Sequence, residues 1–377
     1  METQLQEAPQ KTRRRSWLLL IVPLIVIAVL AVWLIGKKTN DIPPAFDGSS
    51  SALTNSVIIP TLDTPLPAGK TGIWCSSFQL AWNHMRDDVI KGPIKLKEAQ
   101  PLADRLNKGK ESEADYAPGS CYAVAGTVDQ GIVERIQREM RAFTHGRYVP
   151  EIGVMGPTDL VSYAYVNASV PFKRHFINNN KPLTFTDSRG RETKVRSFGL
   201  RSADAHKFTD LRRQVSILYQ SETEFIIDPC ATSEPNQILL AMVAPGKTMA
   251  ETLASVESKI GSAKAEPFSE SAVMLIPNIR YKVTHRFADL EGKDFLNPKF
   301  TRYRIYLAQQ DIDFRFDKTG AKLESEAKMR AAVTPAVRKS ENYIFNQPFL
   351  LIMQKRGAKH PFFVMWVDNA ELLCKSE

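Results

Sequence analysis

The most prominent pattern in the chain is an apolar run near its N-terminus. Trp17 to Ile35 contains no charged residue and consists mainly of Leu, Ile and Val. A bilayer core about 30 Å thick needs about 20 apolar residues in a helix, so this run is long enough to span it. The heavier basic cluster precedes the run, with Lys11, Arg13, Arg14 and Arg15 before it and Lys37 and Lys38 after it. Positive residues stay on the cytoplasmic side, so the pattern predicts a cytoplasmic basic segment at 1–16 and a transmembrane anchor at 17–36, which contacts the membrane through 17–35. The remainder of the chain is then expected to be periplasmic or extracellular.

The end of this run separates an anchor from a cleaved signal peptide. Signal peptides have apolar regions of about 7–15 residues and end at a small-x-small site. Here the run ends in Trp33-Leu34-Ile35-Gly36-Lys37, which offers no such site, so we expect an uncleaved anchor. Residues 37–56 are rich in Pro, Gly, Ser, Asn and Asp and lack periodicity, which is typical of a flexible tether. The globular part is then expected at 57–377, which is long enough for one large domain or two ordinary ones.

Periodicity within the globular part predicts few helices and many strands. Helical spacing of apolar positions predicts helices over 78–86, 131–143 and 248–260, the last with a capping box of Thr248 and Glu251. Strict alternation over Asp311 to Asp317 predicts a half-buried strand, and the continuous apolar run Ile238 to Val243 predicts a strand that is buried on both faces. Further strand-like stretches are 162–170 and 273–283, and a hairpin is expected from 349–353 and 362–367. Because these strands do not alternate regularly with helices, the class is α+β with large mixed or antiparallel sheets.

Composition narrows the partners and the covalent chemistry. The net charge is +9, but the six Lys/Arg and two Glu of residues 1–38 contribute +4, which leaves +5 for the remainder. That excess is modest and forms no long basic run, so nucleic-acid binding is not indicated. The four cysteines, Cys75, Cys121, Cys230 and Cys374, form no metal-binding pattern. In an exported domain they permit two disulfides in three connectivities, or buried free thiols.

No catalytic motif is complete. The nearest is Gly246-Lys247-Thr248 after a buried strand, but a phosphate-binding loop needs another glycine where the chain has Ala241. This stretch is read as a strand-to-helix turn. The six histidines are scattered along the sequence and form no site by spacing. We therefore predict no enzyme activity, no cofactor and no metal site.

Several segments, in the right order, resemble the serpin family. Val166 to Lys173 resembles that family's central-sheet strand of the Asn-Ala-x-Tyr-Phe-Lys type, and Asp311 to Leu323 resembles the strand that runs into its hinge. Other similar segments are 183–196, 238–245 with 248–260, 272–283, 345–350 and 362–367. The resemblance covers about residues 72–370 and identifies the chain as a divergent, membrane-anchored, bacterial-type serpin-like protein. It implies a large central sheet, a C-terminal β-hairpin and a monomeric domain over 57–377.

The resemblance also implies a mechanism. A serpin exposes a loop that a target protease cleaves, and the loop then inserts into the central sheet as a new strand, with release of stored strain. In this chain the loop would run from about Gly320 to Tyr343. The hinge positions implied are Gly320, Ala321, Leu323, Ser325 and Ala327. Counting from each end of the loop brackets the bait bond among Thr334, Pro335, Val337, Arg338 and Lys339. A bait at Arg338-Lys339 would imply a trypsin-like target, whereas the alternative is that both are solvated loop charges.

Departures from the family pattern keep a second interpretation open. Leu323, Glu324 and Glu326 interrupt the hinge, which is usually rich in alanine. The shutter-like positions that match the family are Ser76, Ser77, Asn167 and Gln310, with Gln310 where the family commonly has a histidine. We read Asn167, which heads an Asn-Ala-Ser sequon, as a hydrogen-bonding core residue. The sequence therefore predicts a membrane-tethered inhibitor of serine or cysteine proteases, or alternatively a non-inhibitory binding or structural protein on the same scaffold.

Overall fold

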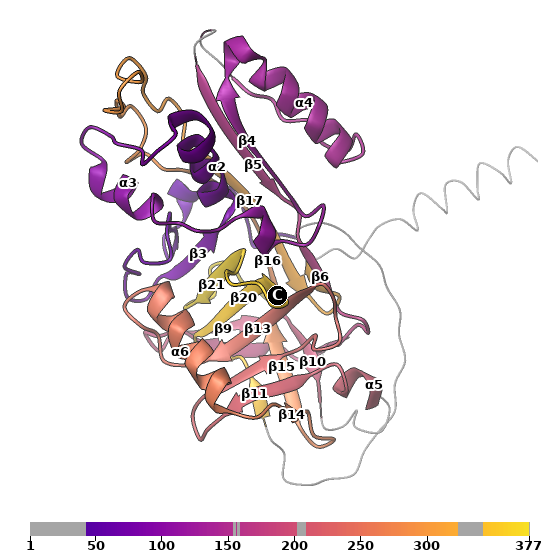
Figure 1. The fold of residues 1–377 in the computed structure, drawn as a ribbon. Coiled ribbons are helices and arrows are strands. Elements are labelled where there is room, and N and C mark those ends of the chain that lie inside the picture. Colours follow the sequence, from indigo (N-terminus) through magenta and orange to yellow (C-terminus); the bar gives the residue numbers. More distant parts are fainter. Residues whose placement is uncertain (1–42, 154–155, 157–158, 202–208, 323–341, 377) are drawn as a thin grey trace, which may run out of the picture. The chain divides into compact units, whose positions relative to one another are not determined.

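The computed structural model describes residues 43–153, 156, 159–201, 209–322 and 342–376 (Figure 1). The chain divides into a unit of residues 1–43 and a unit of residues 44–377, and the description below concerns the second. The predicted anchor at 17–35 lies outside the described residues. Among the residues described, no helix is long and apolar enough to cross a membrane.

An eight-stranded sheet, almost entirely antiparallel, forms one half of the fold. Its order is β14-β11-β12-β13-β20-β21-β3-β2. The strands are β2 (Ser56–Ile58), β3 (Thr71–Cys75), β11 (Ser216–Gln220), β12 (Phe225–Asp228), β13 (Asn236–Met242), β14 (Glu266–Pro267), β20 (Phe349–Lys355) and β21 (Phe363–Val367). The predicted C-terminal hairpin is confirmed, since β20 and β21 pair antiparallel from Phe349 with Val367 to Met353 with Phe363.

A five-stranded sheet and a four-stranded sheet form the other half. The first has the order β1-β16-β17-β18-β6, and the second has the order β19-β15-β10-β7. Their strands are β1 (Phe46–Ser49), β6 (Ser169–Pro171), β16 (Ile279–Arg286), β17 (Gln309–Asp317), β18 (Gly320–Lys322), β7 (Ile177–Asn178), β10 (Ser197–Leu200), β15 (Val273–Pro277) and β19 (Asn342–Ile344). Two hairpins pair separately, β4 (Cys121–Thr127) with β5 (Leu160–Val166) and β8 (Leu183–Thr186) with β9 (Glu192–Val195). The predicted α+β class with large mixed sheets is confirmed.

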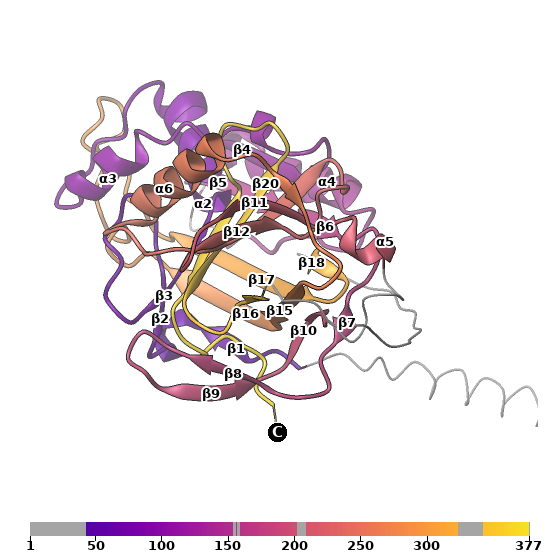
Figure 2. The same cartoon turned by 90° about the horizontal axis from the view of Figure 1, so that it is seen from below.

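Helices cover the β4–β5 hairpin and one face of the eight-stranded sheet (Figures 1 and 2). They are α2 (Ser77–His84), the π-helix η2 (Met85–Ile90), α3 (Gln100–Leu106), α4 (Ile132–Phe143), α5 (Thr209–Arg212), α6 (Met249–Ser262) and the short 3-10 turns η1 (Ser50–Ala52), η3 (Glu113–Asp115) and η4 (Val128–Gln130). Helix α4 packs on β4–β5 through Ile132, Ile136 and Met140. Helix α6 begins as expected, because the Thr248 hydroxyl accepts from the Glu251 backbone N–H.

The main core lies between the eight-stranded and five-stranded sheets. Alternation along β13 sends Ile238 and Leu240 into this core, while Leu239 and Ala241 face α6 on the opposite side. The predicted strand buried on both faces is therefore confirmed. The rings of Phe314 and Phe363 stack with their centroids 4.5 Å apart and join the two sheets.

Several sequence expectations need correction. The tether was expected to reach residue 56, but Phe46–Ser49 forms β1 and pairs parallel with β16, and Ser56–Ile58 pairs with β3. These short strands depend on distant partners, which no local periodicity can reveal. The strand expected over 273–283 is divided at Asn278 into β15 and β16, which belong to different sheets. Of the two alternatives left open for the cysteines, the structure has the second, with all four as free thiols.

Candidate functional site

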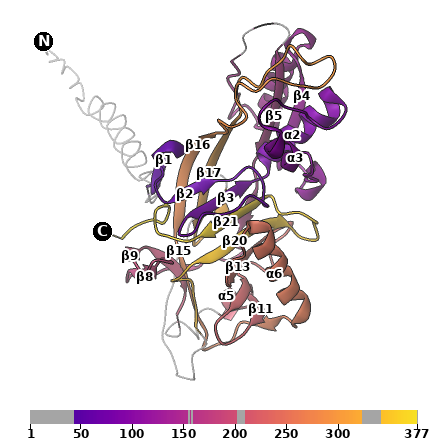
Figure 3. The same cartoon turned by 90° about the vertical axis from the view of Figure 1, so that its left-hand side faces the viewer.

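An open slot lies between β17 and the hairpin β4–β5. It contains a cavity of about 640 Å³. Among the described residues, β5 pairs only with β4, so its other edge carries backbone donors and acceptors without a strand partner. The cavity is lined by residues 47–48, 75, 77–78, 81, 144, 147–148, 162–167, 282–284 and 309–313. Figures 1 and 3 show the β4–β5 hairpin set apart from the β16–β17 pair.

One end of this slot is filled by β18, the first residues of the expected hinge. β18 pairs antiparallel with β17, with Phe316 opposite Ala321 and Asp317 opposite Gly320. On its other side it pairs antiparallel with β6, with Ala321 opposite Val170. Ala321 is buried, with 1% of its surface exposed. The hinge therefore begins as a strand seated between β17 and β6, the strand that follows β5 in the chain.

Two residues hold β18 in this seat. Gly320 has φ +125°, and a Cβ atom there would lie 2.3 Å from the Val170 carbonyl oxygen, so glycine is required by both conformation and space. Asp317 shapes the tight turn before it, since one of its oxygens accepts from the Thr319 backbone N–H at 2.8 Å and from the Thr319 hydroxyl at 2.7 Å. The Phe172 N–H donates to the Thr319 carbonyl at 2.9 Å, which ties the turn to the chain that follows β6.

The floor of the slot is the first turn of α2. The Gln310 side-chain amide donates to the Cys75 carbonyl and to the Ser77 hydroxyl, both at 2.8 Å, which fixes β17 to this turn. The Ser162 hydroxyl donates to the Ala81 carbonyl at 2.5 Å, which fixes β5 to the same helix. Burial raises the pKa of the Cys75 thiol, so this thiol stays protonated and is a poor nucleophile. Both walls of the slot are therefore held by α2, and their separation depends on these polar contacts.

A second polar group joins this floor to the C-terminal hairpin. The Ser76 hydroxyl donates to the Phe362 carbonyl at 3.0 Å and also bonds to the Tyr116 hydroxyl. Burial raises the pKa of Tyr116, which keeps the phenol neutral as a hydrogen-bonding group. The residue that precedes α2 is thus fixed from the opposite side by the eight-stranded sheet.

The outer face of the slot is acidic along β17. Alternation places Ile312 and Phe314 in the core and leaves Asp311 and Asp313 exposed. Asp313 forms an ion pair with Lys282 of β16 at 3.1 Å. Asp311 accepts hydrogen bonds from the Thr284 hydroxyl at 2.5 Å and the Gln309 amide at 2.9 Å. The other charged lining residues are Asp47 of β1 and Arg147 from the loop after α4.

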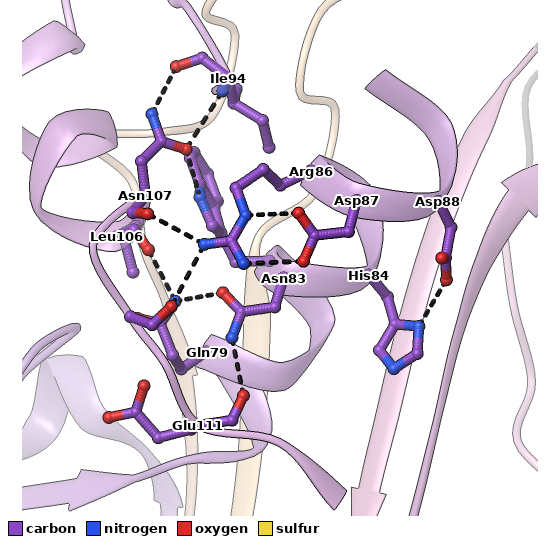
Figure 4. Close-up of polar contacts among 12 residues, drawn as sticks. Gln79, Asn83, His84, Arg86, Asp87, Asp88, Ile94, Leu106, Asn107 and Glu111 are labelled. Carbon is purple, nitrogen blue, oxygen red and sulfur yellow. Dashed lines mark hydrogen bonds and ion pairs between the residues drawn. The ribbon is translucent and has the colours of Figure 1, made fainter. Parts of the chain in front are cut away.

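The far end of α2 is fixed to the segment that leads into β4 (Figure 4). His84 lies between two carboxylates, with Nδ1 2.6 Å from Asp88 and Nε2 2.7 Å from Glu113. Burial lowers the pKa of His84, but the two carboxylates outweigh it, so the net pKa is raised. The Arg86 guanidinium donates from Nη1 to the Asn107 carbonyl at 2.9 Å. The helix beneath the slot is therefore anchored at both ends.

The predicted site residues have different outcomes. The shutter-like Ser76, Ser77 and Gln310 come together at the start of α2. Asn167 lines the cavity, and its backbone N–H donates to the Ser120 carbonyl at 2.7 Å, but it is only half buried, whereas we expected a hydrogen-bonding core side chain. Of the hinge positions, Gly320 and Ala321 lie in β18. The remaining hinge and bait positions fall outside the described residues: Leu323, Ser325, Ala327, Thr334, Pro335, Val337, Arg338 and Lys339.

Sequence reasoning missed three groups that shape the slot. Asp317 was read only as part of a strand, although Asp before Lys-Thr-Gly is typical of a turn that the aspartate caps. Tyr116 and Ser162 gave no local signal, because their partners lie 40 and 81 residues away in the sequence. Only the folded chain brings such groups together.

The chain matches no protein-family model and no curated protein. Its structure is similar to that of thyroxine-binding globulin in complex with thyroxine, with 11% identity, a TM-score of 0.46, and coverage of 80% of this chain and 93% of that chain. It is similar to the thermophilic serpin tengpin in the native state, with 12% identity, a TM-score of 0.46, and coverage of 81% of this chain and 90% of that chain. It is also similar to a serpin of the insect Tenebrio molitor, with 9% identity, a TM-score of 0.45, and coverage of 79% of this chain and 92% of that chain. Two of these structures are named as serpins, the family that the sequence resembles, and the likeness concerns the fold alone.

Proposed function

We propose that this chain is a membrane-tethered, serpin-like inhibitor of extracytoplasmic proteases that acts by inserting its own loop into the slot. The observation that supports this most directly is the position of β18. Strand β18 ends at Lys322, antiparallel to both β17 and β6, and a cavity of about 640 Å³ lies further along β17 and β5. The next residues of the same chain are the natural occupant.

The register of β18 supports this occupant from both sides. If its pairing continues without a bulge, Leu323 would lie opposite Phe314 of β17 and opposite Ala168, both buried. By the same count, Ser325 would lie opposite Ile312 and Val166. Residues that face each other across an antiparallel pair point to the same side of the sheet. The small and apolar side chains of the segment would therefore face the core.

The next step of the count carries the same register to Gln310, near the floor of the slot. Ala327 would lie opposite Gln310 and Ala164. Gln310 is buried and bonded to the first turn of α2, and a methyl group at position 327 would leave these bonds undisturbed. Both neighbouring strands therefore give the same inward positions, 323, 325 and 327, if the register continues.

Cleavage would release the segment that enters. With Arg338 as bait, the hydroxyl of a serine protease adds to the Arg338 carbonyl carbon, and the Arg338–Lys339 amide bond breaks. The proton from the hydroxyl ends on the new amino group of Lys339, and an ester joins the protease to Arg338. Insertion of 323–333 would then drag the acylated protease away before water hydrolyses the ester. The chain acts as bait, not as a catalyst.

The target class and the location follow from the sequence. Arg338 and Lys339 favour a trypsin-like serine protease, because such enzymes recognise a basic residue, while a cysteine protease could be trapped as a thioester. The apolar segment 17–35 and its flanking charges favour a cytoplasmic N-terminus and a periplasmic or extracellular domain. We propose that the inhibitor works as a monomer at the surface of that membrane.

A non-inhibitory binding or structural role is the second candidate. It is favoured by Glu324 and Glu326, which stand in the stretch that has to enter the slot. It is also favoured by Gln310, which bonds firmly to the floor where the family commonly has a histidine. In this alternative the slot would stay open or the sheet would already be relaxed.

The test uses the full chain in detergent micelles, mixed with trypsin. We expect an SDS-resistant complex of the two proteins and, for chain nicked in the loop, a large rise in unfolding temperature. The double variant Arg338→Ala with Lys339→Ala should lose the complex, whereas Arg302→Ala, a change at an exposed basic loop residue of the globular unit, should keep it. A nicked chain without any rise in unfolding temperature would refute insertion and leave the binding or structural role.

A further inference from the structure

The loop that joins β16 to β17 presents apolar side chains to solvent. Figure 1 shows this loop, residues 287–308, in orange beyond the end of the β16–β17 pair. Three of its side chains are large, apolar and exposed: Leu296 at 52%, Tyr306 at 64% and Leu307 at 51%. In the rest of the described chain, Tyr148 is the one further large apolar side chain that is exposed. The loop therefore concentrates apolar surface that no described part of the chain covers.

Pairing with a neighbouring segment fixes which side chains of the loop face outward. The Leu296 N–H donates to the Lys95 carbonyl at 2.8 Å, and the Lys95 N–H donates to the Asn297 side-chain oxygen at 2.7 Å. Leu96 and Phe295 lie opposite each other in this antiparallel pair, and both are buried. Because side chains alternate along paired segments, Lys95 and Leu296 share the outward face.

Cations stand beside these apolar side chains. Lys97 follows two residues after Lys95, so it lies on the same outward face. Lys299 and Arg302 lie in two successive turns at the tip of the loop. All four side chains are exposed, and none forms an ion pair with a carboxylate that the structure describes. We define the loop patch as these four cations together with Leu296, Tyr306 and Leu307.

Carboxylates near the loop patch are already neutralised. Asp294 forms an ion pair with Arg304 at 2.9 Å, and Glu98 forms one with Lys293 at 3.3 Å. The four cations of the loop patch are therefore an excess, and the net charge stays positive when the exposed Asp289 is counted against them.

The composition of the loop patch indicates the kind of partner. Lysine is depleted at protein–protein interfaces, whereas three of these four cations are lysines. Tyrosine is enriched at the level of lipid headgroups, and leucine side chains enter the boundary beneath them. Lysine and arginine near a bilayer are attracted by anionic lipids. Separate apolar side chains among cations therefore fit a bilayer surface with anionic headgroups.

The length of the proposed tether allows this contact. The Ala45 N–H donates to the Arg280 carbonyl, and the loop begins after Arg286, about 20 Å further along β16. Residues 36–44 can span up to about 30 Å when fully extended. A chain that is anchored through 17–35 can therefore place the loop patch on the same bilayer.

With the proposed tether as its premise, we propose that the loop patch is a second membrane contact. Its four cations bind anionic headgroups, and Leu296, Tyr306 and Leu307 enter the interface. The contact holds the globular unit against the bilayer in one orientation. Salt weakens it, because the attraction between the cations and the headgroups is screened.

The experiment measures amide hydrogen exchange of residues 293–307 in the full chain, reconstituted into lipid nanodiscs. Neutral phosphatidylcholine is compared with a mixture that contains about one third phosphatidylglycerol, at about 0.1 M and about 0.5 M salt. One test variant, K95A with R302A, removes charge, and a second, L296S with L307S, removes apolar side chains. The matched control, K181A with K264A, removes two exposed lysines elsewhere. All of these proteins keep residues 1–43 unchanged, so differences among them report the loop patch and not the anchor.

We expect exchange in the parent and the control to be slower in the anionic nanodiscs, and to return toward the neutral rate at about 0.5 M salt. Loss of two cations should weaken docking on the order of 30-fold, so K95A with R302A should exchange equally in both lipids. L296S with L307S should also lose most of the protection. Equal exchange of the parent in the two lipids, or protection that persists in either test variant, would overturn the docking and leave the inhibitor proposal standing. A parent chain that stays out of both kinds of nanodisc would instead refute the proposed tether, and the docking with it.

Discussion

Replacement of Gly320 by alanine is the sharpest test of the seated hinge. The new Cβ atom would lie 2.3 Å from the Val170 carbonyl oxygen and 2.8 Å from the Phe172 nitrogen, and both are backbone atoms that no side-chain rotation can move. The backbone at φ +125° costs an L-residue about 1–3 kcal/mol in addition. β18 must therefore shift, which weakens hydrogen bonds worth about 1 kcal/mol each. We expect a loss of about 3 kcal/mol in the free energy of unfolding.

A matched glycine separates the clash from the conformational strain. Gly357 also has a positive φ, +73°, but a Cβ atom there would meet no atom within 4 Å. Gly357→Ala should therefore cost only about 1 kcal/mol. Urea unfolding followed by tryptophan fluorescence measures both variants against the parent protein, and the slope with urea should not change.

A second measurement shows whether β18 leaves its seat. If the clash expels β18, trypsin should cut after Lys318 and Lys322 faster in Gly320→Ala than in the parent protein, while Gly357→Ala should leave these cuts unchanged. Equal losses of stability in the two glycine variants, with equal rates of cutting, would refute the conclusion that the hinge is packed between β17 and β6.

Two further predictions concern ion pairs with partly buried cations. The two flanking carboxylates raise the pKa of His84. Its contribution to the free energy of unfolding is therefore complete below the ordinary pKa of about 6.5 and is lost as the pH rises through the raised pKa. Unfolding midpoints measured against pH should show this loss in the parent protein and not in His84→Gln. Arg356 donates from Nη1 to the buried Asp228 at 3.0 Å, so Arg356→Met should cost about 3 kcal/mol of unfolding free energy at neutral pH, and the exposed Arg302→Met should cost almost none. A similar loss in both arginine variants would contradict the ion-pair assignment, and an unchanged pH profile in His84→Gln would contradict the histidine assignment.

The elements that sequence predicted best carry their information locally. The alternation of Ile312, Phe314 and Phe316 with charged residues predicts one exposed and one buried face, and β17 has both. The helix after Thr248 was found because its cap and its apolar stripe lie within a few residues of each other. The C-terminal hairpin was found because its two apolar runs are joined by a short turn.

The parts that sequence could not predict depend on long-range pairing. Phe46–Ser49 has no strand-like pattern of its own and becomes a strand only against β16, more than 230 positions later. Nothing local indicates that Asn278 divides an apolar stretch between two sheets. The slot itself follows from the absence of pairing at the free edge of β5 within the described residues, which only the arrangement of whole strands reveals.

The strand β1 also has a mechanical consequence. The Ala45 N–H donates to the Arg280 carbonyl at 2.7 Å, and β1 continues alongside β16 from Phe46 with Tyr281 to Ser49 with Thr284. A force applied to the chain before residue 44 would therefore load the five-stranded sheet directly and would not be absorbed by a surface loop. Because β1 and β18 lie on opposite sides of the β16–β17 pair, pulling would strip the sheet at the β1 edge, while a longer β18 would extend the pairing on the far side of β17. The rupture force measured through the N-terminus would then report whether the sheet is open or filled.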